Sequence, residues 1–539
     1  MSLEKREKSD RRPGFGHEEE SDVMQLVREG RKGLFDILFS RAAQFTILIL
    51  LQFAVLIGIF TFLGEYLPHA FAVHIIMTAA AALYIVNGNF DPSPKLTWLL
   101  VILIVPVFGI LLLVIVNTNL GNRKLKREME SITERTKCRI PQAQNTLRRM
   151  LSHERELLSL STFVNKSGCY PVYENTDVRY FPLGEEMFSV FLEELRKAEK
   201  FIFLEFFIIE EGYMWGSVLS ILAEKAKQGL EVRVCYDGTC EFSLLPHDYP
   251  ERLAKLGIKC KVFSPMKPFI STHYNYRNHR KIAVIDGKVG FTGGVNLADE
   301  YINHKDRFGH WKDTAVMLQG KAVRSLTLMF LQSWGLQGGR ANYGKYLKHL
   351  DDGTERQNGF VFPFGDSPLD DKRVGELVYM DILNHSEHYV HIMTPYLILD
   401  GEMETALKFA AGRGVDVRII VPGIPDKPIA YSLCQGHYRT LIDAGVKIYE
   451  YTPGFVHAKV VVSDNDTAVV GTINFDYRSF YHHFECAVYM RGASCIGAIE
   501  KDFLETMKKC REVNGARIRE RTAGMKIMAI LAKAVAPLM

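Results

Sequence analysis

The sequence predicts an α/β fold with two related α/β sandwich half-domains that form one shared active site, preceded by N-terminal transmembrane helices. Three observations support this prediction. Strand-like apolar runs alternate with helical stretches over most of the chain. The same succession of runs occurs twice. Before residue 120, two uncharged segments are long enough to cross a bilayer.

The N-terminal part of the 539-residue chain divides by composition. We expect a charged tail over residues 1–40 and a transmembrane region over 41–120, with spans near 42–63, 69–86 and 96–116. The length of the charged tail argues against a cleavable signal peptide. Basic residues flank the first and last spans, which favours a multi-pass membrane protein with its catalytic part in the cytoplasm. That orientation needs two crossings, whereas hydropathy offers three segments. The alternative to a membrane region is a buried apolar hairpin of a soluble protein.

The two half-domains are expected over residues 121–345 and 346–515. Residues 201–209 resemble residues 389–397, and both runs are strand-like. A helical stretch follows each run and leads into a further pair of similar strands. Residues 516–539 combine Arg and Lys with Met, Ile and Leu, which is typical of a basic amphipathic helix. Such a helix either lies on anionic lipid or packs on the body of the protein.

The pattern His-x-Lys-x-x-x-x-Asp occurs twice, and each copy continues into an apolar strand, a Gly and then an Asn. A single copy would be a weak signal, but a chance pairing does not explain the matching Asn. Alternate side chains of an extended segment point to the same face, so each His and Lys project together. The two sets are His279, Lys281, Asp286 and Asn296, and His457, Lys459, Asp464 and Asn474.

These residue types suit the cleavage of a phosphodiester without a metal. One neutral imidazole can attack phosphorus while a second imidazolium protonates the leaving oxygen. Lys ammonium groups and Asn amides can hold the phosphoryl oxygens as negative charge builds. Because the two imidazoles must act in different protonation states, we expect the two motif copies to face each other across one site.

Composition excludes several other classes of function. The nine Cys are odd in number and have no paired short spacing, so we expect free thiols. No cluster of Cys or His at short spacing predicts a zinc site, and we expect no metal and no cofactor. A net charge of +4 is too mild to indicate nucleic-acid binding.

These features together resemble the phospholipase D superfamily. Within it, residues 275–282, 474–480 and 484–485 are similar to bacterial cardiolipin synthases, as are residues 91–98, 105–109 and 311–313. The resemblance implies a transferase of the bacterial plasma membrane that joins two phosphatidylglycerol molecules into cardiolipin and releases glycerol, through a phosphatidyl-histidine. Its partners would be phosphatidylglycerol and membrane lipids. One departure is His483, where the family leads us to expect Asn.

The resemblance also assigns roles. His279 is expected to be the nucleophile and His457 the acid and base, although the symmetry of the motifs does not settle the order. Asp286 and Asp464 belong to the catalytic motif, but they more plausibly support it than react. The expected catalytic residues are His279, Lys281, Asp286, His457, Lys459 and Asp464, and the expected phosphate-binding or supporting residues are Asn296, Asn474 and Glu485.

Other functions stay open on the sequence. The acceptor is decided by pocket shape, so a phospholipid hydrolase or headgroup-exchange enzyme would carry the same motifs. A nuclease of the same superfamily is disfavoured by the apolar spans and by the mild net charge. A non-catalytic membrane scaffold is disfavoured because both motifs are intact.

Overall fold

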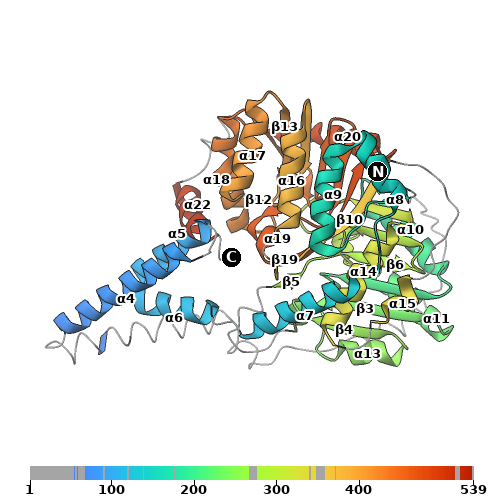
Figure 1. Ribbon diagram of the computed structural model, residues 1–539, viewed down its shortest axis with the longest axis horizontal. Helices are drawn as coiled ribbons and strands as arrows, with labels where there is room; N and C mark the ends of the chain where they lie inside the picture. Colours follow the sequence, from blue (N-terminus) through green and yellow to red (C-terminus); the bar gives the residue numbers. More distant parts are fainter. Residues whose placement is uncertain are drawn as a thin grey trace, which may run out of the picture.

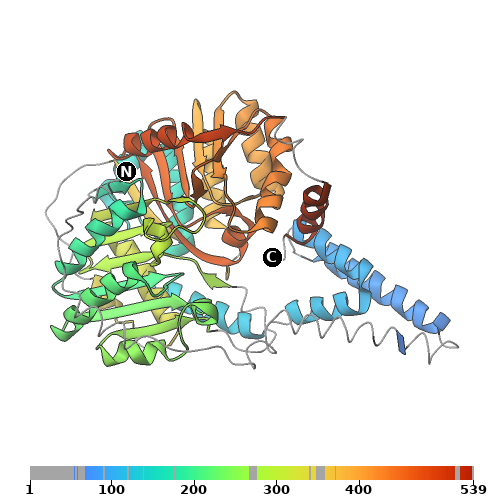
Figure 2. The ribbon, with the colours of Figure 1, turned by 180° about the vertical axis from the view of Figure 1, so that it is seen from behind.

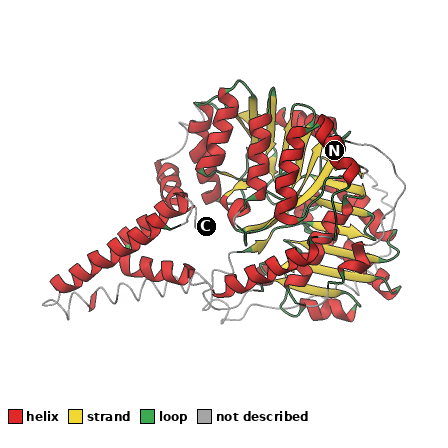
Figure 3. Ribbon diagram, in the orientation of Figure 1, coloured by secondary structure: helices red, strands yellow, loops and turns green. Residues whose placement is uncertain are grey.

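The computed structural model describes residues 67–88, 92–117, 120–137, 139–174, 176–265, 276–338, 341–347, 359–370, 372–515 and 523–536, together with Ala54, Ile57 and Gly58. Its body contains two mixed β-sheets with helices packed on their faces (Figures 1 and 3). The predicted α/β fold with two related halves is confirmed by the strand order of these sheets.

The first sheet has seven strands, with the strand that follows Lys281 at its centre. In order across the sheet, they are β1 (Thr176–Phe181), β9 (Ala315–Gly320), β7 (Val289–Gly293), β6 (Ile282–Ile285), β2 (Phe201–Phe206), β3 (Glu231–Asp237) and β4 (Lys259–Phe263). β2, β3 and β4 are parallel, whereas each pair between β1 and β2 is antiparallel.

The second sheet repeats this order and these directions, strand for strand. Its strands are β10 (Phe360–Asp366), β19 (His483–Arg491), β17 (Thr467–Gly471), β16 (Val460–Ser463), β11 (Tyr389–Met393), β13 (Asp416–Pro422) and β14 (Lys447–Tyr451), with β20 (Cys510–Glu512) added at the edge. β6 and β16 are therefore equivalent. Both are fully buried and rich in Val and Ile, which suits a central strand.

Helices fill the connections between strands. Those of the first half are α7 (Leu120–Thr136), α8 (Gln144–His153), α9 (Arg155–Gly168), α10 (Gly184–Arg196), α11 (Tyr213–Lys227), α12 (Cys240–Ser243), α13 (Tyr249–Lys255), the 3-10 helix η3 (Asp299–Ile302), α14 (Val323–Leu336) and α15 (Tyr343–Leu347). Those of the second half are α16 (Val374–His385), α17 (Gly401–Gly412), α18 (Pro428–Ile442), α19 (Tyr477–Tyr481), α20 (Ile496–Met507) and α22 (Ala523–Val535).

One hydrophobic core joins the two halves. Along β2, Ile202 and Leu204 face α10 and α11 on the outer side of the first sheet, whereas Phe201 and Phe203 face the inner side. The inner core continues through α14, which is buried almost all round and contacts both β6 and β10. The two halves are thus packed against each other through α14.

Two short strand pairs cross from one half to the other. β5 (Arg277–Asn278), which leads into His279, pairs with β19 of the second half. β15 (Gly454–Val456), which leads into His457, pairs with β8 (His310–Lys312) of the first half. A further short pair, β12 (Leu397–Ile398) and β18 (Phe475–Asp476), lies within the second half. Each motif histidine is therefore placed by a strand of the opposite half.

The N-terminal helices project from the body as an arm (Figures 1 and 2). The expected span over 69–86 lies in α4 (Leu67–Asn87). The expected span over 96–116 covers parts of two helices, because the chain breaks at Val105 between α5 (Pro92–Ile104) and α6 (Pro106–Asn117). Pro106 lacks a backbone N–H and starts the new helix.

The break brings α5 and α6 together. A Cβ on Gly109 would meet Ile102 Cα at 3.0 Å, so the absence of a side chain at residue 109 permits this approach. Within the described part of the chain, no helix combines the length and apolar content that crossing a bilayer requires. The tail over 1–40 and almost all of the expected span over 42–63 lie outside the described residues.

Candidate active site

The two motif histidines each face a buried carboxylate from the opposite half. The register of β5 with β19 pairs Asn278 with Phe484, which sets His279 beside Glu485. The register of β15 with β8 pairs Val456 with Lys312, which sets His457 beside Asp313. Neither carboxylate is exposed to solvent.

His279 is held through its Nδ1 atom. This atom lies 2.9 and 3.0 Å from the two carboxylate oxygens of Glu485, and the His279 backbone N–H donates to Phe484 O at 2.9 Å. Glu485 also accepts a hydrogen bond from the Thr472 hydroxyl. An ionised Glu485 carboxylate can only accept hydrogen bonds. The His279 Nδ1 atom therefore carries the proton, and Nε2 is left with its lone pair.

His457 is held by Asp313, but its Nδ1 atom also lies 2.9 Å from Lys459 Nζ. Its Nδ1 atom lies 2.6 Å from Asp313 Oδ2, and its backbone N–H donates to Lys312 O at 2.7 Å. The second oxygen of Asp313 accepts from the Thr314 backbone N–H at 2.8 Å. Glu485 was expected as a supporting residue, whereas Asp313 was not expected in the site.

Asp313 and Glu485 occupy equivalent positions in the two halves. In the first sheet Gly293 pairs with Ala315, and in the second Gly471 pairs with Ala487. Each carboxylate lies two residues before the Ala of its pair. Asp313 lies 17 residues after its motif Asn (313 − 296) and Glu485 lies 11 residues after its own (485 − 474), so a search at one fixed spacing would not have found both.

The residue after the motif glycine differs between the two halves, and so does its contact with the carboxylate. A Cβ on Gly294 would lie 1.9 Å from Asp313 Oδ1, so this approach requires glycine. The equivalent residue of the second half is Thr472, whose hydroxyl instead donates to Glu485. The repeat therefore keeps the position and changes the way the carboxylate is supported.

The two motif lysines converge on the same buried centre. Lys281 Nζ donates to His279 O at 2.7 Å, and Lys459 Nζ donates to His457 O. Burial lowers the pKa of Lys281 to about 7 and that of Lys459 to about 8. The charge of Lys459 further lowers the pKa of Lys281, although Lys281 belongs to the other motif copy. The structure therefore brings the two copies together.

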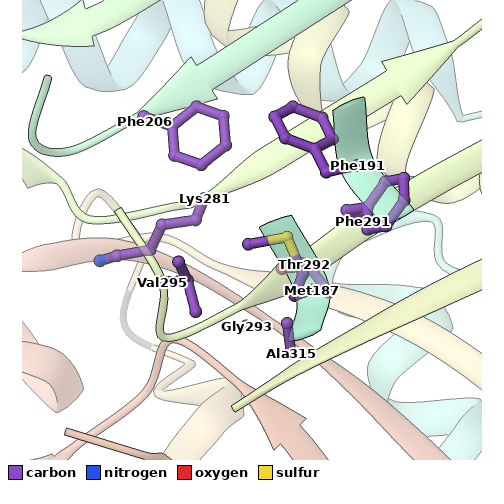
Figure 4. A pocket seen from close by; sticks show the side chains of 9 residues that line it. All are labelled: Met187, Phe191, Phe206, Lys281, Phe291, Thr292, Gly293, Val295 and Ala315. Atoms are coloured by element: carbon purple, nitrogen blue, oxygen red, sulfur yellow. The ribbon is translucent and has the colours of Figure 1, made fainter. Parts of the chain in front are cut away.

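An apolar pocket explains the desolvation of Lys281. The pocket spans about 270 Å³ when the adjoining open solvent is included, and its lining is mostly apolar (Figure 4). In Figure 4 the Lys281 chain passes the pocket and its nitrogen points away from the phenyl rings. The lining residues are Met187, Phe191, Phe206, Lys281, Phe291, Thr292, Gly293, Val295 and Ala315.

The two His–carboxylate pairs differ in the pKa of their carboxyl groups. Burial lowers the pKa of both His279 and His457 well below the usual value, so both rings are neutral in the free site. Although burial opposes its ionisation, contacts with His279 and His483 hold the pKa of Glu485 well below its usual range. Burial raises the pKa of Asp313 to about 6. Glu485 is therefore the more firmly ionised of the two.

The motif aspartates lie away from the histidines, at the far ends of β6 and β16. Asp286 accepts the backbone N–H groups of residues 199, 200 and 201 at 2.7 to 2.8 Å. Asp464 accepts those of residues 387, 388 and 389 at 2.8 to 3.0 Å. Each carboxylate thus holds the start of the neighbouring strand, β2 or β11.

The motif asparagines are also engaged by the protein. Asn296 accepts from the Ile208 backbone N–H at 3.0 Å and donates to the Tyr301 hydroxyl at 2.8 Å. Asn474 donates to Asp476 Oδ2 at 3.3 Å, and its Oδ1 makes no hydrogen bond among the described residues. Asn296 is therefore a support of the loop that precedes η3, and Asn474 is the less constrained of the two.

Folding also brings together a potential metal site that sequence spacing did not predict. His279, His483 and Glu485 place one ligand atom each within 4.8 Å of one another. His483 was noted in the sequence only as a departure from the expected Asn. No ligand signal was visible there, because 204 residues separate it from His279 (483 − 279).

Both motif copies lie in regions that match a known protein family. The family described as "Cardiolipin synthase, PLD-like domain" matches residues 191–323 and 379–507, which include both motif copies. Residues 76–116 match the "Phospholipase_D-nuclease N-terminal" family.

Relatives of known name extend the match. A cardiolipin synthase of Alkalihalophilus pseudofirmus is 33% identical, over 84% of this chain and 90% of its own. A cardiolipin synthase of a Geobacillus species is 34% identical, over 84% of this chain and 90% of its own. An uncharacterized protein of Streptococcus mutans is 52% identical, over 85% of this chain and 99% of its own.

A solved structure supports the fold. Phosphatidylserine synthase of Haemophilus influenzae aligns with a TM-score of 0.54 at 15% identity, over 67% of this chain and 95% of its own. Fold and site together define a two-motif enzyme of the phospholipase D type. Within that class, the chain belongs to the family of bacterial cardiolipin synthases.

Proposed function

We propose that the protein is a phosphatidyltransferase that condenses two phosphatidylglycerol molecules into cardiolipin and glycerol. The observation that carries this proposal is the pair of buried histidines, each held by a carboxylate from the opposite half and each in contact with its motif lysine. The names of the related cardiolipin synthases support the choice of substrate.

In the first step, His279 Nε2 attacks the phosphorus of phosphatidylglycerol. The Glu485 carboxylate holds the Nδ1–H and stabilises the imidazolium that forms. His457, neutral in the free site, takes up a proton from solvent when the anionic phosphodiester binds. The bond from phosphorus to the glycerol oxygen then breaks, and this imidazolium donates its Nε2 proton to that oxygen. Glycerol leaves, and a phosphatidyl group stays bound to His279.

In the second step, His457 acts as the base. Its neutral Nε2 takes the proton from a hydroxyl of a second phosphatidylglycerol, whose oxygen attacks phosphorus. The P–N bond to His279 breaks and cardiolipin leaves. Lys281 and Lys459 stabilise the charge on the phosphoryl oxygens in both steps. Both histidines are buried, with 6 and 7% of their surface exposed, which helps to exclude water as a competing acceptor.

His279 is the better nucleophile of the pair by this reasoning. Its partner Glu485 is firmly ionised, whereas the pKa of Asp313 lies at about 6. An ionised partner keeps the Nδ1–H in place and leaves the Nε2 lone pair free. Trapping the covalent intermediate and locating the phosphate by peptide mass spectrometry would test this order, and a phosphatidyl group found on His457 would reverse it.

Products discriminate this function from the hydrolase alternative. The covalent intermediate conserves the phosphodiester, so cardiolipin should form from phosphatidylglycerol alone. Purified protein in mixed micelles should release cardiolipin and glycerol in equal amounts. Strict dependence on CDP-diacylglycerol would overturn the proposal, and phosphatidic acid as the sole product would favour a hydrolase.

We also propose that the N-terminal helices attach the enzyme to the bacterial plasma membrane. Apolar side chains on α4 and α5 are exposed, among them Ile76 at 66% and Leu103 at 69%. α22 contacts α5 and α18 and exposes Ile527 and Ile530 beside this arm (Figure 1). Fractionation of cells that express the full chain and a chain lacking residues 1–120 tests this attachment. Equal recovery of both in the soluble fraction would refute it.

A further inference from the structure

His483 is a buried histidine beside the proposed nucleophile. Only 7% of its surface is exposed, and neither of its ring nitrogens makes a hydrogen bond among the described residues. Its Nδ1 atom lies 3.3 Å from Glu485 Oε1, and its ring centre lies 5.2 Å from that of His279. A buried polar group without a hydrogen bond is costly, so its presence requires an explanation.

The ring nitrogens nearest to Glu485 are the Nδ1 atoms of His279 and His483. Two imidazole nitrogens and one carboxylate oxygen form a common ligand set for Zn²⁺, with a fourth position left for water. Ligand atoms around a tetrahedral Zn²⁺ lie about 3.3 Å apart. The three ligand atoms here lie within 4.8 Å of one another, so small side-chain rotations would complete the site.

We propose that His279, His483 and Glu485 bind one Zn²⁺ ion and that this ion blocks the enzyme. The ion would replace the proton on His279 Nδ1. That proton passes to solvent, and a Zn–N bond forms without any redox change. Glu485 would then coordinate the metal in place of the histidine. The positive charges of Lys281 and Lys459 repel the ion. The negative charges of Glu485 and Asp313 compensate for this repulsion.

The binding of Zn²⁺ stands on the ligand cluster alone, whereas the block rests on the proposed function of His279. His483→Asn is the natural test, because it introduces the amide that the family resemblance predicts at this position. His391→Asn is a matched control, because His391 is also buried and contacts a carboxylate, Glu500, at 3.0 Å, away from the motif histidines.

Direct titration tests the site first. The full chain, stripped with EDTA and dialysed, would be titrated with Zn²⁺ against a chromogenic chelator, and with Co²⁺ by visible absorption. Wild type and His391→Asn should bind one ion per chain at this site. His483→Asn should lose that ion or bind it at least about tenfold more weakly. Equal affinity of His483→Asn and wild type would overturn the site.

Inhibition is then measured as a fraction of each variant's own metal-free rate. Zn²⁺ should inhibit cardiolipin formation by wild type over the concentration range in which it binds, and His483→Asn should need at least about tenfold more. Binding without inhibition would overturn the block but not the site. A protein that binds Zn²⁺ and makes no cardiolipin in any condition would refute the proposed function while the site stands.

Discussion

At the scale of single residues, the site consists of two His–carboxylate pairs that look alike and differ in the pKa of the carboxyl group. Glu485 is ionised and contacts two histidines, whereas Asp313 has a pKa of about 6 and contacts one. In the proposed mechanism, this difference suits His279 to the role of nucleophile and His457 to that of acid.

Asp313→Asn should lower kcat by about 100-fold or more, because the amide no longer stabilises the imidazolium form of His457.

His279→Ala and His457→Ala should each lower activity by several orders of magnitude, since the pair acts as a unit. Cardiolipin formation by purified variants measures these losses. A variant of either histidine with more than about a tenth of the wild-type rate would exclude the shared site.

The pH dependence of kcat/KM should be bell-shaped. Asp313 ionises above about pH 6, so its support for His457 is lost as pH falls through that value. Lys281 and Lys459 are charged below their pKa values of about 7 and about 8, so phosphate binding is lost as pH rises through them. The residual activity of Asp313→Asn should lack the acid limb, and an unchanged acid limb would assign it to another group.

The motif aspartates should affect stability more than catalysis. Asp286→Ala leaves three backbone N–H groups near β2 without their acceptor, at a cost of about 1–3 kcal/mol for each one that stays buried. Asp464→Ala should cost less, because the N–H groups that it binds are more exposed. Thermal unfolding should rank the two, and activity per folded molecule should fall by less than about tenfold. A far larger loss of activity at an unchanged melting temperature would show that Asp286 and Asp464 take part in catalysis.

At the scale of elements, short strands of one half pair with strands of the other and place the motif histidines. β5 pairs with β19 and β15 pairs with β8, and each pair ends where a histidine meets its carboxylate. The same two contacts therefore hold the halves together and build the site. At one of these points the Asp313 carboxylate lies so close to the backbone of Gly294 that a side chain there would clash with it.

Gly294→Ala tests this restriction. The new Cβ would clash with Asp313 Oδ1, so Asp313 must move away from His457. We expect kcat to fall by at least about tenfold, since catalysis depends on the geometry of the pair. Gly436→Ala in α18 is the control, because a Cβ there meets no atom within 4 Å and alanine favours the helix. Equal activity of both variants would show that Asp313 tolerates displacement.

At the scale of the whole molecule, two repeated halves share one core and one reaction centre. The charge at this centre is supplied by Lys281 and Lys459, so the chemistry proposed does not need an added metal. Cardiolipin formation in detergent should therefore survive exhaustive EDTA treatment. A loss of activity that one divalent ion restores would contradict the proposed mechanism.

The sequence by itself determined the repeat, the α/β class and the two motif copies, because these depend on local patterns that recur along the chain. It also indicated His279, Lys281, His457 and Lys459, which the structure brings together. The domain boundaries and the catalytic roles stay predictions.

Only the tertiary structure decided which carboxylate serves which histidine. Asp313 lies 144 residues from His457, and Glu485 lies 206 residues from His279, so no local spacing links them. The structure also placed the motif aspartates at the far ends of their strands and His483 beside Glu485. It showed a break at Val105 in an apolar run that hydropathy had predicted as one span. Each of these depends on how the two halves or the helices pack, and periodicity along the chain carries no information on that packing.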